Sequence, residues 1–354
     1  MEFEMNSDTK KQAFVTGSTG LLGNNLIREL LSQGWQVKAL VRSATKAKES
    51  FGDLIDNTSL TIITSDMESV ASIRHDLTDC DALFHAAAYF RDSFQPGQHF
   101  DKMRNINVDC TIELLKLADQ QGVKKVVYVS STAVFKDGME LSPTNESHSR
   151  LSDETENDYY RSKILAAIAI GEFLKQSKLP VIYILPGFMH GPGDIGPTSA
   201  GRNVLDYLNG KLPGFVDATM SVVDARDVSQ AMITAVKKGI TGERYLVGGR
   251  TMSFPKIYSH LEQVTGIPAP TKKVPYWFLY FYGWLNELYA KLTKKEVQIT
   301  RHGARLLKDK NYYDSSKSIA EVDVHFRPFH ETINDTVKWY QSNGFVGVRS
   351  KAGQ

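Results

Sequence analysis

A tyrosine and a lysine in the middle of the chain have the spacing needed for proton transfer at an oxygen atom. Tyr159 and Lys163 form Y-x-x-x-K, which places both side chains on one face of a helix. A free phenol, with a pKa of about 10, is a poor base at neutral pH. A lysine ammonium beside it favours the phenolate and lowers the phenol's pKa toward the range that proton transfer needs.

A hydroxyl partner for this pair is expected about thirty residues earlier, at the end of a predicted strand. The segment YVSSTAVF supplies Ser130, Ser131 and Thr132, and the residues alone leave all three open. Such a hydroxyl would bond to the substrate oxygen and stabilise its developing charge. Tyr160 lies three residues from Lys163, which breaks the spacing, so we expect it to line the substrate site or to pack.

A glycine-rich turn near the N-terminus predicts a dinucleotide site. In AFVTGSTGLLGNNL, glycines follow a predicted strand and open a predicted helix. Small residues are needed there because the backbone must turn tightly and approach a pyrophosphate, whose charge the helix N-terminus attracts. The expected cofactor contacts in this turn are Thr16, Gly17, Thr19, Gly20, Leu21, Leu22 and Gly23.

The residue after the second predicted strand indicates which dinucleotide is bound. An acidic residue there would receive the ribose hydroxyls of NAD, but the chain reads Val41, Arg42, Ser43. A guanidinium suits a 2′-phosphate, which it can bind through paired hydrogen bonds. We therefore predict NADP(H); the alternative is an exposed arginine without a ligand.

The spacing G-x-x-G-x-x-G after Thr16, followed by Y-x-x-x-K, resembles the extended form of the short-chain dehydrogenase/reductase superfamily, the NAD-dependent epimerase/dehydratase family. The resemblance runs from about Gln12 to Gly344. The blocks PGFMHGPGDIGPTSAGR, VDARDV and GERYLVGG are similar to its dihydroflavonol-4-reductase-like and hopanoid-associated sugar epimerase-like branch. Counted back from Val134-Phe135, which resembles the family's V-Y, Ser131 takes the catalytic place.

The resemblance also implies roles outside these motifs. Lys163 would hold the nicotinamide ribose, and Asn107 resembles a helix asparagine in a buried kink that organises active-site water; a satisfied helix asparagine is the alternative. His190 is expected to be structural. Further cofactor contacts are implied after the third to sixth strands: Asp66, Met67, Ala86, Ala87, Ala88, Ser130, Pro186 and Gly187.

Alternating short apolar runs and helical patterns must position these residues. They predict an α/β fold, a Rossmann-type doubly wound parallel sheet with a smaller, mainly helical C-terminal substrate lobe. Gly34 should end the helix that follows the first strand. All six expected strands look buried: Ala13–Thr16, Val37–Val41, Leu60–Ile63, Ala82–His85, Val126–Val129 and Val181–Leu185.

Changes in composition predict two parts. We assign residues 10–188 to the dinucleotide-binding domain, with 216–249 returning to it, and residues 189–215 and 250–345 to the substrate lobe. Within the lobe, YWFLYFYGWLNELY (Tyr276–Tyr289) is too short to span a bilayer. We expect a helix that covers the substrate pocket; core packing and adsorption to a membrane surface are the alternatives.

Composition excludes several classes of partner. A formal charge of +2 with interspersed charges is not typical of nucleic-acid binding, and Cys80 and Cys110 have no second ligand at metal spacing, so buried free thiols are expected and no metal site. The N-terminus fits neither a secretory signal nor a transit peptide, so we expect a cytoplasmic protein. Extended members occur as monomers or homodimers, and both remain open.

These features favour one function and leave two alternatives. The leading hypothesis is reduction of a carbonyl, or oxidation of the alcohol, on a small apolar or aromatic substrate by NADP(H) and a Ser-Tyr-Lys triad. The alternatives are a nucleotide-sugar epimerase with retained cofactor and a non-catalytic cofactor-sensing regulator. Family dehydratases carry an Asp-Glu pair where this chain has Thr132 and Ala133, which argues against sugar dehydration.

Overall fold

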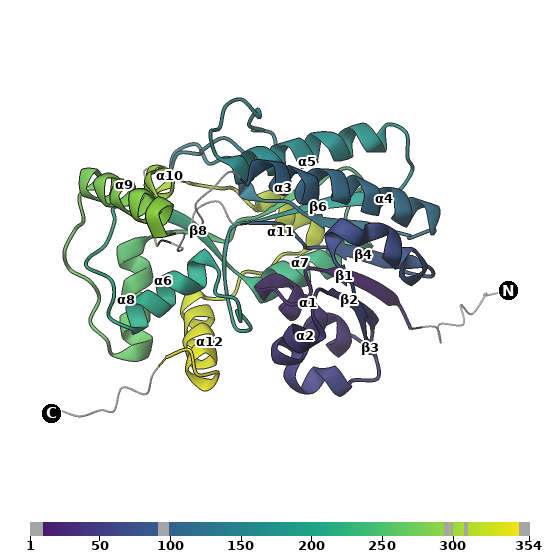
Figure 1. The fold of residues 1–354 in the computed structure, drawn as a ribbon, viewed down its shortest axis with the longest axis horizontal. Helices are drawn as coiled ribbons and strands as arrows, with labels where there is room; N and C mark the ends of the chain where they lie inside the picture. The colour runs from purple at the N-terminus through teal and green to yellow at the C-terminus, as the bar shows by residue number, and fades with distance from the viewer. Residues whose placement is uncertain (1–9, 91–98, 294–296, 298–299, 308–310, 347–354) are drawn as a thin grey trace.

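A seven-stranded parallel sheet forms the centre of the computed structural model (Figure 1). The structure describes residues 10–90, 99–293, 297, 300–307 and 311–346. The strand order is β3-β2-β1-β4-β5-β6-β9, so the chain reverses direction across the sheet between β1 and β4, where Rossmann folds bind dinucleotides. The strands are β1 (Gln12–Thr16), β2 (Gln36–Val41), β3 (Leu60–Thr64), β4 (Ala82–His85), β5 (Val126–Val129), β6 (Val181–Pro186) and β9 (Arg244–Val247).

Helices cover both faces of this sheet and bury its apolar side chains (Figure 1). One face packs against α1 (Leu21–Ser32), α2 (Ala44–Phe51), α7 (Ala225–Lys238) and α11 (Ser316–Val322). The other packs against η2 (Met67–Leu77), α4 (Cys110–Gln120) and α5 (Asp158–Leu174). Shorter helical segments complete this half: η1 (Gly52–Asp56), α3 (Phe100–Arg104), η3 (Asn105–Asp109) and η4 (Thr132–Val134).

The predicted Rossmann architecture is confirmed, and each of the six predicted strands is present with its ends within one residue of the expected bounds. The expectation that all six strands are buried is wrong for β3. Its Thr61 and Thr64 are exposed because β3 is an edge strand that pairs only with β2. The first helix ends at Ser32, just before Gly34, which has a φ of +80° that favours glycine. Cys80 and Cys110 are buried free thiols, as predicted.

A smaller sheet and five helices form the rest of the described chain. The sheet has the order β10-β8-β7, and the sequence patterns did not reveal β7 and β10, which have only three and four residues. Among the described residues, no helix is long and apolar enough to cross a membrane. The elements are β7 (Phe188–His190), β8 (Thr219–Asp224), β10 (Arg250–Ser253), α6 (Ser199–Leu208), α8 (Phe254–Thr265), α9 (Tyr276–Thr293), α10 (Arg301–Leu306) and α12 (Phe329–Ser342).

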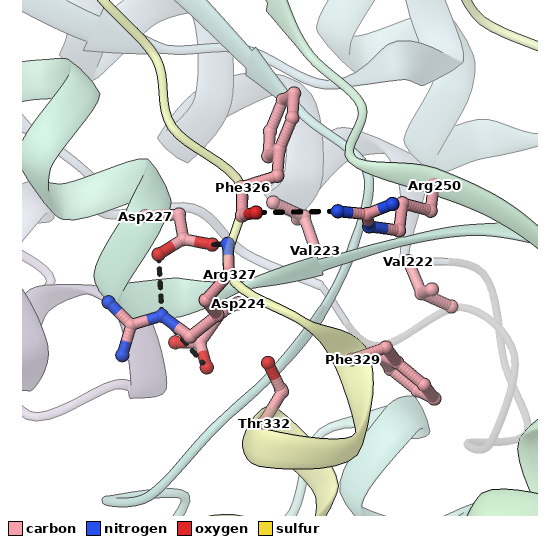
Figure 2. Close-up of a pocket in the computed structure, with 9 residues that line it drawn as sticks. All are labelled: Val222, Val223, Asp224, Asp227, Arg250, Phe326, Arg327, Phe329 and Thr332. Atoms are coloured by element: carbon pink, nitrogen blue, oxygen red, sulfur yellow. Dashed lines mark hydrogen bonds and ion pairs between the residues drawn. The ribbon is translucent and has the colours of Figure 1, made fainter.

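Ion pairs join α7 to the segment before α12, around a small cavity (Figure 2). Asp224 caps the N-terminus of α7 and bonds to Arg226, which also reaches Asp335 at 2.7 Å. Arg327 pairs with Asp227 at 2.6 Å from Nε to Oδ1. Since these charges neutralise one another and none of the predicted site residues lines the cavity, we interpret the cluster as structural.

Candidate active site

The turn between β1 and α1 has a shape that only glycine allows. Gly17 has a φ of +69°, and a Cβ there would lie 2.7 Å from the backbone of Ala86. A Cβ on Gly23 would lie 2.2 Å from the carbonyl oxygen of Gly17. These contacts hold the turn, the first residues of α1 and the loop after β4 close together, so the sequence-predicted glycines do meet at one place.

The N-terminus of α1 is free to bind an anion. The N-cap residue, Gly20, makes no side-chain capping bond, and the first turn of the helix contains no acidic residue. The backbone N–H groups and the positive end of the helix dipole therefore face outward without a competing carboxylate. Leu21 and Leu22 are buried beneath the turn, whereas Thr19 is half-buried and Gly20 is exposed.

Thr16 supports the turn from below. It is fully buried, and its hydroxyl bonds to His85 Nδ1 at 2.7 Å and accepts a bond from the Ala87 N–H at 3.2 Å. His85 Nε2 in turn contacts the Thr111 hydroxyl at 2.9 Å. Burial, together with the charge of Lys163, lowers the pKa of His85 to about 3, so the ring is neutral. The sequence patterns missed this chain of bonds, because its members are far apart along the chain.

The cofactor contacts predicted after β2, β3 and β4 follow the ends of three strands of the main sheet. Arg42 follows β2 and is exposed, and among the described residues none forms an ion pair with it. Asp66 follows β3; it is half-buried and caps η2 by accepting a bond from the Glu68 N–H at 2.8 Å. Met67 is buried. Ala86 and Ala87 are half-buried and Ala88 is exposed in the loop after β4.

Lys163 is the most constrained of the candidate catalytic residues. It is 2% exposed, and its Nζ donates to the Val129 carbonyl at the end of β5, at 3.1 Å. The same Nζ lies 6.0 Å from the ring centroid of Tyr159 and 5.3 Å from that of Tyr128. Burial lowers the pKa of Lys163 to about 8, which leaves most of it charged at neutral pH. Helix α5 thus places Tyr159 and Lys163 together beside the end of β5.

The three hydroxyls after β5 have different surroundings. Ser130 is 3% exposed, and its hydroxyl has no partner among the described residues. Ser131 is half-buried and accepts a bond from the Ala133 N–H at 3.2 Å, which leaves its own hydroxyl hydrogen available. Thr132 contacts Tyr313, a residue that the sequence patterns did not single out. Of the three, Ser131 combines partial exposure with a donor that can point toward a substrate.

Asn107 connects the loop after β4 to α5. It lies in the π-helix η3 and is 2% exposed. Its amide oxygen accepts from the Tyr89 N–H at 2.7 Å, and its amide nitrogen donates to the Tyr89 carbonyl and the Ser162 hydroxyl, both at 3.0 Å. Phe90, which follows Tyr89 in the chain, packs edge-on against Tyr159, with ring centroids 4.5 Å apart. Through these bonds Asn107 connects the loop that carries Tyr89 and Phe90 to Ser162 of α5.

The chain after β6 passes close to the second sheet. Pro186 is buried and ends β6, and a Cβ on Gly187 would lie 2.5 Å from the Gly248 carbonyl. His190 is 3% exposed between the rings of Phe188 and Phe329, away from any described partner for its ring nitrogens. Its burial lowers its pKa to about 4, as expected for a neutral packing residue.

The model of the NAD dependent epimerase/dehydratase family matches residues 13–248. A putative dihydroflavonol 4-reductase of Synechocystis sp. is 29% identical, with 94% of this chain and 95% of the relative covered. Sterol demethylase protein B of Methylococcus capsulatus is 30% identical over 94% of this chain and 99% of the relative. A nucleoside-diphosphate-sugar epimerase of Pseudomonas aeruginosa shares the fold, with a TM-score of 0.77, 19% identity and coverage of 96% and 100%.

Proposed function

The chain belongs to the NAD dependent epimerase/dehydratase family, whose members use a nicotinamide cofactor, and we propose that it is an NADP(H)-dependent oxidoreductase. Its proposed reaction is the reduction of a carbonyl, or the oxidation of the corresponding alcohol, on a small apolar or aromatic substrate. The observation that carries this proposal is the buried Lys163 beside Tyr159 at the end of β5. A buried ammonium next to a phenol is costly unless it has a task there.

The free hydrogen-bonding groups around β5 fit a nicotinamide ribose. Val129 satisfies one N–H of Lys163, and the described residues offer no other acceptor to it. The buried hydroxyl of Ser130 likewise lacks a partner. Ribose hydroxyls would satisfy both groups, while the N–H groups at the start of α1 would hold the pyrophosphate. When bound, the cofactor supplies or accepts the hydride.

The protein's own residues would handle the proton. Tyr159 donates a proton to the substrate oxygen in reduction and removes it in oxidation, and the positive charge of Lys163 favours the phenolate form. Ser131 donates a hydrogen bond to the same oxygen and stabilises its negative charge as it develops. Asn107 keeps Tyr89 and the adjacent Phe90 in place, and the ring of Phe90 in turn holds the ring of Tyr159 in position.

Arg42 carries the preference for NADP(H) over NAD(H). It is exposed at the end of β2, next to the turn that would hold the adenosine half of the cofactor. The first turn of α2 behind it contains no acidic residue that would repel a 2′-phosphate. A guanidinium without an ion-pair partner among the described residues is therefore available to that phosphate.

The test compares two neighbouring tyrosines. The purified chain is assayed for loss of NADPH absorbance with a panel of aromatic and aliphatic ketones and aldehydes, and for epimerisation of nucleotide sugars. Tyr159→Phe should lower kcat by about 10²–10⁴-fold, because it removes the proton donor. Tyr160→Phe is the matched control. Since we expect Tyr160 to line the substrate site or to pack, this variant can change KM, but kcat should stay within a few-fold.

Three outcomes would count against this assignment. Equal losses in the two variants would remove Tyr159 from its proposed role. Epimerisation without net consumption of NADPH would favour the epimerase alternative. Normal NADPH binding with no turnover of any substrate would favour a cofactor-sensing regulator.

A further inference from the structure

The C-terminal half of helix α9 does not turn its large apolar side chains toward the protein. The two buried residues of the helix are Gly283 and Ala290. The half-buried positions on the same side are Tyr276, Leu279, Tyr280, Asn286 and Glu287, and Glu287 pairs with Arg301 at 2.8 Å. From Gly283 onward, small and polar residues therefore contact the protein, where apolar side chains would be expected.

The opposite face of α9 exposes large apolar side chains. Trp277 is 69% exposed and Leu292 is 78% exposed, at the two ends of the helix. The exposed apolar residues of the described chain outside α9 are scattered along the chain, whereas on α9 they lie on one side of the helix from Trp277 to Leu292. The exposed set on α9 is Trp277, Phe278, Phe281, Tyr282, Trp284, Leu285, Leu288, Tyr289 and Leu292.

The position of α9 leaves this face open. The helix lies at an edge of the molecule far from the N-terminus, beside α10, and no described element covers its outer side (Figure 1). The alternative that this stretch packs in the core is therefore wrong. The expectation that the helix covers a substrate pocket stays a prediction for its inner side, where Tyr276 and Tyr280 are half-buried, and it does not account for the exposed outer side.

The charges around this face are basic. Lys272 and Lys273 precede α9, Lys291 lies in its last turn, and all three are exposed. Glu287 is neutralised by Arg301, and Asp217 pairs with Lys273 at 2.6 Å. An aromatic face with lysines at both ends is complementary to a partner that offers an apolar layer bordered by negatively charged groups.

We propose that the outer face of α9 lies in the interface of a lipid bilayer that contains anionic phospholipids. Tryptophan and tyrosine suit this depth because each has a large apolar ring and one polar atom that stays in contact with water or headgroups. Lysine side chains extend from the ends of the helix to the phosphate groups. The proposal concerns attachment alone and does not depend on the proposed redox reaction.

A second copy of the chain fits this face less well. In a symmetric dimer the same patch is used by both copies, so α9 would pack against α9. An antiparallel arrangement brings Lys272 of one copy near Lys291 of the other, and a parallel one brings each lysine near its own counterpart. Both arrangements place like charges together at the rim of an apolar contact, which is unfavourable.

The test measures binding of the full chain to vesicles by flotation. One set of vesicles is phosphatidylcholine alone, and the other contains phosphatidylglycerol as well. We expect binding to the mixed vesicles, weaker binding to phosphatidylcholine, and a decrease at high salt as the lysine attraction is screened. Lipids brominated along their acyl chains should quench the fluorescence of Trp277 and Trp284, and binding should shift the emission to the blue.

Two matched triple variants distinguish binding through α9 from nonspecific binding of exposed apolar residues to lipid. Trp277→Gln/Phe281→Gln/Leu288→Gln should reduce binding to mixed vesicles at least about 10-fold, because each loses apolar area that the bilayer would bury. Leu141→Gln/Leu151→Gln/Ile240→Gln changes three exposed apolar residues elsewhere and should leave binding unchanged. Circular dichroism and NADPH binding of both variants check that the fold is intact.

The proposal is overturned if the unmodified chain binds neither kind of vesicle, or if the α9 variant binds as well as the control variant. It is also overturned if sedimentation without lipid shows a dimer that the α9 substitutions dissociate. In that case the apolar face is an interface between two copies.

Discussion

At the scale of single residues, the structure separates side chains that the sequence motifs treat alike. Ser130 and Ser131 are adjacent, but one hydroxyl is buried without a described partner and the other is half-buried and accepts a local bond. Asn107, which the family resemblance links to active-site water, makes three hydrogen bonds, to Tyr89 and Ser162. An amide can make four, so its oxygen keeps one acceptor site, and the link to water stays a prediction.

Replacing Arg42 tests its proposed contact with the 2′-phosphate of NADPH. Arg42→Ala should weaken NADPH binding by about 10–100-fold, because a charge-assisted hydrogen bond contributes about 1.5–3 kcal/mol. Binding of NADH should change little. The measurement is the dissociation constant of each cofactor by fluorescence titration, and Lys46→Ala, an exposed cation on α2, is the control. An unchanged ratio of NADPH to NADH affinity in Arg42→Ala would remove this residue from cofactor selection.

Among the helices and turns, two departures from regular geometry lie at the candidate site: the π-helix η3 and the glycine turn after β1. The π-helix η3 puts Asn107 at a point where the regular hydrogen-bond ladder is widened, a feature that often marks functional positions. The glycine turn brings β1, α1 and the loop after β4 within backbone contact. The glycine turn follows β1, beside the point where the strand order reverses, and Asn107 of η3 bonds to Tyr89 in the loop after β4, the strand on the other side of that point.

The element-scale prediction compares two helical glycines. Gly23→Ala should destabilise the protein and weaken NADPH binding, because its Cβ would lie 2.2 Å from the Gly17 carbonyl. Gly171→Ala in α5 meets no atom within 4 Å and should stabilise the helix by about 0.5–1 kcal/mol. Thermal unfolding with and without NADPH measures both effects. A Gly23→Ala protein with normal stability and affinity would show that the turn tolerates a side chain.

At the scale of the whole molecule, the two sheets are joined by contacts between distant segments. The ion pair between Arg327 and Asp227 ties the segment before α12 to α7 (Figure 2), and Arg226 of α7 pairs with Asp335 in α12 itself. His190 fills the space between β7 and α12, against the ring of Phe329. These contacts hold α12 and the segment before it against α7 and β7.

The buried His190 should make the stability of the protein depend on pH. Its pKa falls from about 6.5 when unfolded to about 4 when folded, so the unfolded chain binds more protons between these values. Its contribution to stability is complete above about pH 6.5 and is lost as the pH falls toward 4, by up to about 3 kcal/mol. His190→Phe should flatten this part of the pH profile in urea unfolding. His148→Phe, at an exposed histidine, is the control; the same flattening in both variants would contradict the assignment.

The sequence by itself determined the positions of six strands along the chain, the glycine turn and the spacing of Tyr159 and Lys163. Those features depend on residues within one strand, one turn or one helix, where local geometry decides the outcome. The edge position of β3, the short strands β7 and β10, and the chain of bonds through Thr16 and His85 became visible only in the tertiary structure. Each depends on which distant segments meet, and burial, hydrogen-bond partners and the open face of α9 are properties of that packing.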